Sequence, residues 1–201
     1  MIHKKEDIQN KGRERKIITY TVPLSIRDID EDPIKLKNDP NELTKENIKN
    51  KAFEYHSKGD LITAEKYYKQ FIDRGYKDPL IFGNYAIILN QKKDHNKSIE
   101  FFKKSINIDN KNAGTQYNLG YQLLTLKRFK EAKIYLENSI KLNPNLGDAH
   151  YNLAYILNEF KEYEKAKYSI QKAIQLSPKF AYAYFVQAMI LKSLSEIENA
   201  K

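Results

Sequence analysis

The feature that most constrains this chain is an internal repeat with a period of 34 residues. The strings Tyr-Asn-Leu-Gly-Tyr-Gln-Leu-Leu and Tyr-Asn-Leu-Ala-Tyr-Ile-Leu-Asn begin at Tyr117 and Tyr151. Matching landmarks follow at the same step: Leu119 and Leu153, Gly120 and Ala154, Phe129 and Tyr163, Ala132 and Ala166, and Pro144 and Pro178. A fixed period of this length predicts a stacked array of similar units.

Steps of the same length divide residues 45–201 into four complete units and a partial fifth. The complete units are 45–78, 79–112, 113–146 and 147–180, and the partial unit is 181–201. The two earlier units keep weaker landmarks, including Ala52, Ala64, Tyr85 and Phe102. One short unit cannot bury its own apolar side, so stability has to come from stacking on the next unit.

Apolar residues within a unit recur at intervals of three and four, which is the spacing of a helix buried on one side. In the third unit these are Leu119, Leu123 and Leu126, followed by Ala132, Leu136 and Ile140. Small residues let two helices approach closely, and a proline cannot continue a helix interior. We therefore expect an all-α fold with two helices in each unit.

This pattern resembles the tetratricopeptide repeat, a helix-turn-helix of that length, over residues 45–201. The resemblance implies a right-handed α-solenoid whose first helices line a concave groove. It also implies a scaffold that binds an extended peptide or partner protein, with no cofactor and no catalysis.

The first two units depart from the pattern. The first has Lys51 where the others have Tyr85, Leu119 and Leu153, and it ends at Gly75-Tyr-Lys-Asp without a proline, so we expect it to be the least regular. The second unit has Ser98 where the other complete units have a small alanine (Ala64, Ala132 and Ala166). Its turn reads Gln91-Lys-Lys-Asp-His, where glycine is commoner.

The fifth unit is incomplete. It begins at Ala181, and Ala200 and Lys201 fall just inside its expected second helix. A terminal repeat needs a polar outer face, which the last helix does not clearly supply. We expect either that the chain is a fragment of a longer protein, or that a partner or a second copy covers this end, which would make a homo-oligomer.

Residues 1–44 contain no repeat. Ile18, Tyr20, Val22, Leu24 and Ile26 alternate with Thr19, Thr21, Pro23 and Ser25, the period of a half-buried strand. Two interpretations stay open, a mobile tail and an extended stretch that packs along the array or binds a partner. Asp39-Pro and Thr44 predict a turn and a helix N-cap.

The most specific candidate site is a column of asparagines. Asn50, Asn84, Asn118 and Asn152 are the sixth residues of four successive units, and Val186 breaks the column in the fifth. A carboxamide both donates and accepts, so stacked amides can hold a peptide backbone irrespective of its sequence. The column resembles the asparagine ladder of the O-GlcNAc transferase repeat array, which implies the same use. The alternative is that each amide only satisfies local hydrogen bonds.

Tyrosines flank this column. Tyr117 and Tyr121 are four residues apart, as are Tyr151 and Tyr155, so the two rings of each pair share a helix face; Phe53 and Phe185 occupy equivalent places. Phenol rings give contact area with a polar end and lose little rotamer freedom on binding. The set favours a recognition groove, although any single ring could equally pack between units.

The charge of the chain is strongly positive, but its pattern argues against nucleic acid. The net charge is +9, carried by 30 Lys and only 5 Arg. Most lysines fall on the second helices and should face solvent: Lys66, Lys69, Lys103, Lys104, Lys133 and Lys167. We therefore expect no nucleic-acid partner. Lys49 is a lone candidate for a site that clamps a terminal carboxylate, and we expect no such clamp.

The sequence contains no recognisable catalytic motif and no membrane-spanning segment. The sequence has no cysteine, and His3, His56, His95 and His150 form no pair at metal-ligand spacing. It shows no phosphate loop and no nucleophile motif. No run approaches about 18 apolar residues and no signal peptide is evident. We expect a cytoplasmic, non-enzymatic protein with no membrane partner.

One alternative function stays open. The stretch from Ala52 to Ile72 and the string Asn84-Tyr-Ala-Ile-Ile-Leu resemble the start of bacterial tetratricopeptide proteins that carry transferase domains further along. That resemblance implies a substrate-recruiting arm of a glycosyl-, sulfo- or methyltransferase.

Overall fold

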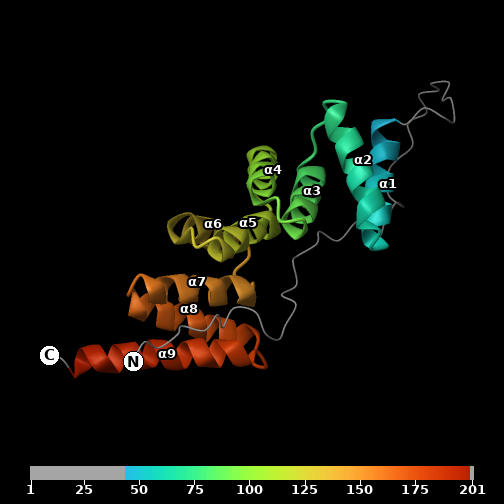
Figure 1. Ribbon diagram of the computed structural model, residues 1–201. Coiled ribbons are helices and arrows are strands. Elements are labelled where there is room, and N and C mark those ends of the chain that lie inside the picture. The colour runs from blue at the N-terminus through green and yellow to red at the C-terminus, as the bar shows by residue number, and fades with distance from the viewer. Residues whose placement is uncertain (1–43, 200–201) are drawn as a thin grey trace, which may run out of the picture.

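The computed structural model describes residues 44–199, and this part of the chain folds into nine α-helices. They are α1 (Lys45–Ser57), α2 (Leu61–Asp73), α3 (Pro79–Gln91), α4 (His95–Ile108), α5 (Ala113–Thr125), α6 (Phe129–Leu142), α7 (Gly147–Glu159), α8 (Tyr163–Leu176) and α9 (Ala181–Glu198). The first helix of each pair begins at the first residue of a unit. Figure 1 shows the pairs stacked in chain order, which makes this part of the chain an all-α solenoid.

Caps on the helix N-termini divide the array into two parts. Thr44 caps α1 as predicted, because its hydroxyl accepts from the Asn47 N–H at 3.2 Å. Asp60, Asp78, Asp94 and Asn112 cap the next four helices in the same way. The last four helices have no side-chain cap, so their stability depends more on packing.

The turn between the two helices of each complete unit contains one residue in the left-handed conformation. These residues are Gly59, Lys93, Lys127 and Lys161, with φ of 78°, 64°, 59° and 61°. In the second unit the N–H of Asp94 then donates to the carbonyl of Leu89 at 2.9 Å, which closes a Schellman motif. Three lysines thus hold a conformation that normally favours glycine, because a Cβ crowds the backbone there.

Small residues allow the two helices of a unit to pack closely. A Cβ on Gly120 would lie 2.9 Å from Cγ of Leu136 and 3.2 Å from its backbone nitrogen, so glycine fits best there. The serine at the small position of the second unit is tolerated, because Ser98 Oγ donates to the Ala86 carbonyl at 2.7 Å.

The apolar core has two parts that meet in α3. One part lies among α1, α2 and α3 and includes Ile48, Tyr68 and Phe71. The other runs from α3 to α9 and includes Leu119, Leu136, Ile156 and Ile190. Because α3 contributes side chains to both, it joins the first unit to the rest of the array.

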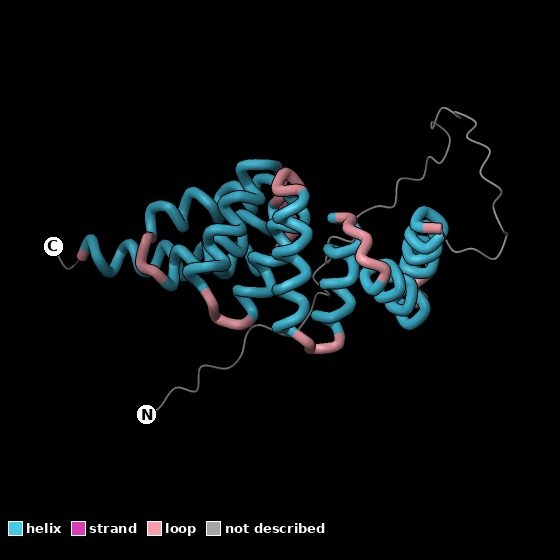
Figure 2. The backbone as a smooth tube through the Cα atoms, turned by 90° about the horizontal axis from the view of Figure 1, so that it is seen from above, coloured by secondary structure: helices cyan, strands magenta, loops and turns pink. Residues whose placement is uncertain are grey.

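The helices form two surfaces. The first-helix surface consists of α1, α3, α5, α7 and α9, and the second-helix surface of α2, α4, α6 and α8. Along the first-helix surface α3 contacts α5, α5 contacts α7, and α7 contacts α9. Figure 2 shows short loops joining the helices and no strand among the described residues.

The ends of the array differ from its middle. The first unit leaves α2 through Gly75, at a φ of 76°, whereas the next three units leave through the extended residues Asp109, Asn143 and Ser177. The prediction of a second helix beginning near the C-terminus was wrong, because α9 continues unbroken to Glu198. Ser195 stands where the other units turn, and beyond it Glu196, Ile197 and Asn199 are exposed, so they give the chain no apolar contact to fold back on.

Two predictions concern residues 1–43. The extended stretch from Ile18 to Ile26 and the turn at Asp39-Pro both lie outside the described residues. Among the described helices, none is both long and apolar enough to cross a membrane.

Candidate peptide-binding surface

The structure separates the four predicted asparagines into two groups. Asn84, Asn118 and Asn152 are buried on α3, α5 and α7, with 3%, 4% and 1% of their surface exposed. Asn50 is exposed on α1. The equal spacing in the sequence therefore does not give equal environments, and only the later three amides share one.

The buried amides differ in their hydrogen bonds. Asn84 hydrogen-bonds through its side chain to the hydroxyl of Tyr68, which in turn lies 2.7 Å from Nδ1 of His56. Its Oδ1 is buried without a partner, and in Asn152 neither Oδ1 nor Nδ2 has one. A buried polar atom without a partner costs about 1–3 kcal/mol. Asn152 is therefore an unsatisfied amide that a peptide group could pair.

The side-chain hydrogen bonds that link Asn84, Tyr68 and His56 were not predicted from the sequence. Burial lowers the pKa of His56 and raises the pKa of the Tyr68 phenol. A neutral His56 can accept a hydrogen bond from the Tyr68 hydroxyl, and the oxygen of that hydroxyl accepts a hydrogen bond from the Asn84 amide. The three groups belong to α1, α2 and α3, so only knowledge of the helix packing could have grouped them.

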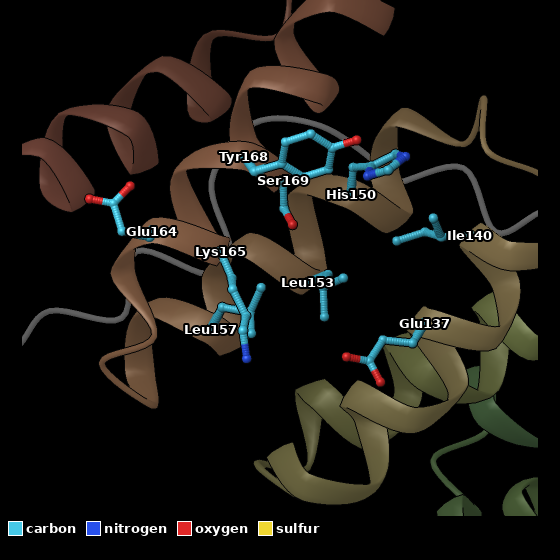
Figure 3. Close-up of a pocket in the computed structure, with 9 residues that line it drawn as sticks. All are labelled: Glu137, Ile140, His150, Leu153, Leu157, Glu164, Lys165, Tyr168 and Ser169. Carbon is cyan, nitrogen blue, oxygen red and sulfur yellow. The ribbon is translucent and has the colours of Figure 1, made fainter.

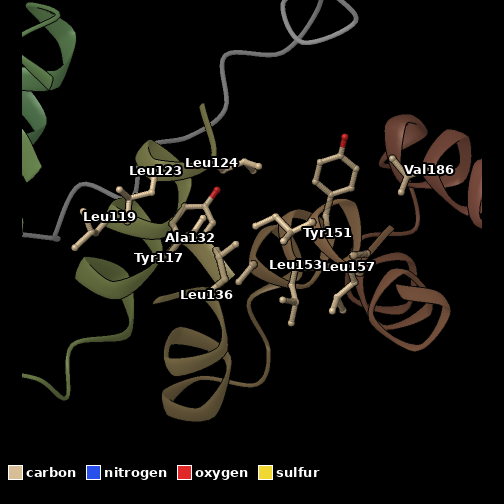
Figure 4. Packing of buried hydrophobic residues seen from close by; sticks show 14 of the residues in the cluster. Tyr117, Leu119, Leu123, Leu124, Ala132, Leu136, Tyr151, Leu153, Leu157 and Val186 are labelled. Atoms are coloured by element: carbon tan, nitrogen blue, oxygen red, sulfur yellow. The ribbon is translucent and has the colours of Figure 1, made fainter. Parts of the chain in front are cut away.

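The predicted tyrosines occupy the same surface, in two degrees of burial. Tyr117 and Tyr151 are buried at 2% and 7% exposure, and Tyr121 and Tyr155 are half-buried. The rings of Tyr117 and Tyr121 stack, with centroids 6.2 Å apart and an interplanar angle of 11°. Figure 4 shows the hydroxyl groups of Tyr117 and Tyr151 pointing to the same side.

Aromatic neighbours hold the other two rings. The ring centroids of Tyr151 and Phe180 lie 4.7 Å apart, and those of Tyr155 and Phe129 lie 6.3 Å apart in an edge-on arrangement. These contacts join α7 to the α8–α9 loop and to the start of α6. The rings therefore pack between units and also belong to the surface beside Asn152.

Lys49 of the first unit is paired within the chain. Lys49 Nζ lies 2.8 Å from a carboxylate oxygen of Asp78, so the lone candidate for clamping a carboxylate already has a counter-ion. Of the lysines predicted to face solvent on second helices, Lys66, Lys69, Lys103 and Lys104 are exposed, and Lys133 and Lys167 are half-buried.

A cavity of about 460 Å³ lies on the second-helix surface, between α6 and α8 above α7 (Figure 3). None of the eight predicted site residues lines it. Within residues 44–199, no three His, Asp or Glu side chains gather as a metal site.

Comparisons with known proteins agree with this geometry. Tetratricopeptide repeat models match residues 81–112, 113–146 and 135–168. A crystal structure of MamA protein matches with a TM-score of 0.69 at 23% identity, covering 79% of this chain and 86% of that one. A second MamA structure gives a TM-score of 0.65 at 24% identity, with 72% and 84% covered.

A tetratricopeptide repeat protein from Parabacteroides merdae shares the fold at a TM-score of 0.65 and 18% identity, over 77% of this chain and 61% of that one. No curated protein matches the chain. The repeat matches, the stacked helix pairs and these shared folds identify the chain as a tetratricopeptide repeat protein.

Proposed function

We propose that the chain is a protein-interaction scaffold that binds an extended polypeptide along the first-helix surface and catalyses no reaction. Its repeats and its structural neighbours support the scaffold class, because such solenoids typically present a surface for binding and carry no catalytic groups. The particular surface and its ligand are inferred from the side chains.

The unsatisfied amide of Asn152 is the single observation that carries this proposal. Both of its polar atoms are buried without a partner, next in the chain to Tyr151 and on the same helix as Tyr155. A ligand backbone offers both an N–H and a C=O, so it can pair both atoms at once. Because the amide is buried in the free chain, binding includes a shift of the side chains around it.

Half-buried phenols would supply the remaining contact area. Tyr121 and Tyr155 lie one helical turn from Asn118 and Asn152 on α5 and α7. Rings of this kind contact a ligand through their faces and bond through their hydroxyls. The ligand favoured here is an extended, partly apolar polypeptide.

Nucleic acid is less well supported. Ion pairs tie up Lys69 and Lys133 on the second helices, with Glu65 and Glu162 at 2.9 and 2.8 Å. The tyrosines lie on first helices instead, so basic and aromatic groups are not interleaved. Filter binding across salt concentrations should show no salt-sensitive retention near physiological ionic strength.

The experiment begins with a display library of unstructured peptides selected on the full chain, followed by affinity measurement of the best peptides. Replacing Asn118 and Asn152 together by Ala should weaken binding by about tenfold or more, since two peptide hydrogen-bond sites are lost. Circular dichroism should show unchanged helicity.

Asn138 provides the matched control, because it is an exposed asparagine of α6 on the second-helix surface. Asn138→Ala should bind like the unaltered chain. Equal affinities for the double variant and the control would contradict the proposal, and a collapse of melting would show that the amides are structural.

Exposed apolar residues on α9 add a second interaction to the proposal. Tyr184, Phe185 and Leu191 are 45%, 47% and 45% exposed on the last described helix. A second copy of the chain, or another polypeptide, would cover them. Light scattering tests the first case: mass should rise with concentration, and Phe185→Lys should prevent the rise.

A further inference from the structure

The cavity on the second-helix surface has an apolar floor and polar walls. Leu153 and Leu157 of α7 and Ile140 of α6 line it, together with Tyr168 and Ser169 of α8. Figure 3 shows these residues around one opening. A volume of about 460 Å³ is within the range of cavities that bind ligands.

This cavity exists because an aromatic residue is missing from the fourth unit. Tyr67, Phe101 and Tyr135 occupy the place of Ser169 in the first three units, and all three rings pack against the core. Serine there removes the ring that fills the gap between units elsewhere. The space has the location of an aromatic side chain that the chain itself does not supply.

Ser169 is also polar without a partner. It is 4% exposed, and no hydrogen bond of its hydroxyl occurs among the described residues. Figure 3 shows the hydroxyl directed into the opening. A hydroxyl that faces the opening can donate to or accept from a group that a ligand brings to it.

The charge of the cavity is reversed relative to the preceding junction. Its lining carries two carboxylates and one lysine, whereas the places 34 residues earlier carry two lysines and one carboxylate: Glu137, Glu164 and Lys165 against Lys103, Lys130 and Glu131. Figure 3 shows the two carboxylates on opposite sides of the opening. On a chain of net charge +9, this is a local site for positive charge.

The neighbouring lysines pair with one of these carboxylates and leave the other without an ion pair. The carboxylate of Glu162 forms ion pairs with Nζ of Lys133 and Nζ of Lys165, at 2.8 and 2.7 Å. Lys133 also pairs with Glu137, at 4.0 Å, whereas Glu164 has no ion pair among the described residues and is the carboxylate that a partner cation can pair.

We propose that this cavity binds a partner polypeptide that inserts an aromatic side chain between α6 and α8 and places lysine or arginine residues beside it, against Glu137 and Glu164. The ring replaces the one that Ser169 lacks, and the hydroxyl of Ser169 bonds to the partner. This site is separate from the first-helix surface, so either can fail without the other.

The probe is the synthetic peptide acetyl-Lys-Phe-Lys-amide, titrated into the ¹⁵N-labelled full chain and followed by NMR. The amide signals of Leu153, Leu157 and Ser169 should shift and saturate. The peptides acetyl-Glu-Phe-Glu-amide and acetyl-Lys-Ala-Lys-amide should each bind about tenfold more weakly, because one lacks the charge and the other the ring.

Two variants test the two parts of the site. Ser169→Tyr restores the ring of the other units, so it should abolish binding while melting stays unchanged or rises. The exposed pair Glu137→Lys and Glu164→Lys reproduces the preceding junction and should weaken binding about tenfold. Glu159→Lys, on an exposed residue at the end of α7, is the charge-matched control and should bind normally.

Equal binding of all three peptides, unchanged binding by the double lysine variant, or shifts confined to Asn118, Tyr121 and Tyr155 would each overturn the proposal. If Ser169→Tyr fails to fold, the double lysine variant still decides the role of charge.

Discussion

The first and fourth units place different chemistry at the same positions of their first helices. α1 buries only Ile48, Ala52 and Phe53. α7 buries most of its length, including the polar residues His150 and Asn152. The same helix of the repeat is thus mostly exposed in the first unit, whereas in the fourth it buries an amide and a phenol. The side chains, and not the backbone, therefore decide what each unit can bind.

The two units also differ in how they are held. The first is joined to the second by the ion pair of Lys49 with Asp78, the residue that caps α3, and by the hydrogen bonds that link Asn84, Tyr68 and His56. The fourth is joined to the third by the aromatic contact of Tyr155 with Phe129, and its Tyr151 packs against Phe180, the residue that precedes α9. The first junction should therefore respond to pH and the later ones to changes in packing.

The largest expected effect separates the two cores. Phe71→Ala should cost about 3–5 kcal/mol, because Phe71 is fully buried in the core of α1–α3. Repeat units are stabilised mainly by nearest neighbours, so α1 and α2 should lose protection in hydrogen exchange while α5–α8 keep theirs. Uniform loss of protection along the chain would show that the array unfolds as one unit.

The next effect contrasts two asparagines of the same column. Asn84→Ala should lower the free energy of unfolding by about 1–3 kcal/mol, because it leaves the buried Tyr68 hydroxyl without its donor. Asn152→Ala removes an amide that has no partner, so it should leave stability unchanged or raised. Urea unfolding of both variants measures the difference. Equal losses would mean that the Asn152 amide is satisfied in solution.

Stability should fall in acid at the first unit. Burial lowers the folded-state pKa of His56 below its ordinary 6.5, so the unfolded chain binds the proton more readily. The stabilisation is present above pH 6.5 and is lost as pH falls through the lower folded pKa. One proton limits the slope to about 1.4 kcal/mol per pH unit.

Melting curves at several pH values check this, with His56→Gln as the comparison variant. The unaltered chain should lose stability between neutral and acid pH more steeply than the variant. Parallel curves would contradict the assignment to His56.

The smallest effect concerns the turns within units. Lys161→Gly should stabilise the fourth unit by about 1 kcal/mol, because glycine adopts the φ of 61° without strain. The first unit already has Gly59 at this place, so Gly59→Ala should cost a similar amount. Thermal melting of both variants should show opposite shifts, and shifts of the same sign would argue that the lysine side chains contribute contacts of their own.

Much of the fold could be predicted from the sequence because the repeat is regular. Spacing of three and four residues gives the helices, and Gly120 and Pro144 mark a close crossing and an exit. The end of α9 could not be predicted by copying the period, since a turn forms only where a second helix packs back, and Glu196, Ile197 and Asn199 are exposed.

The candidate site was less accessible to sequence reasoning. Position six carries asparagine in four units, yet Asn50 is exposed and Asn152 is buried, because burial depends on the neighbouring units. The cavity beside Ser169 had a signal that went unused: three aromatic residues at 34-residue steps followed by a serine. Comparing the residues at this one place of the four units shows that only the fourth lacks an aromatic side chain.

The place of the ligand on the first-helix surface can be measured directly, because the sequence contains no cysteine and a single one can be introduced for labelling. A benzophenone label on Tyr155→Cys should cross-link a selected peptide, whereas the same label on Asn138→Cys, on the second-helix surface, should not. Cross-linking from Asn138→Cys with none from Tyr155→Cys would contradict the account.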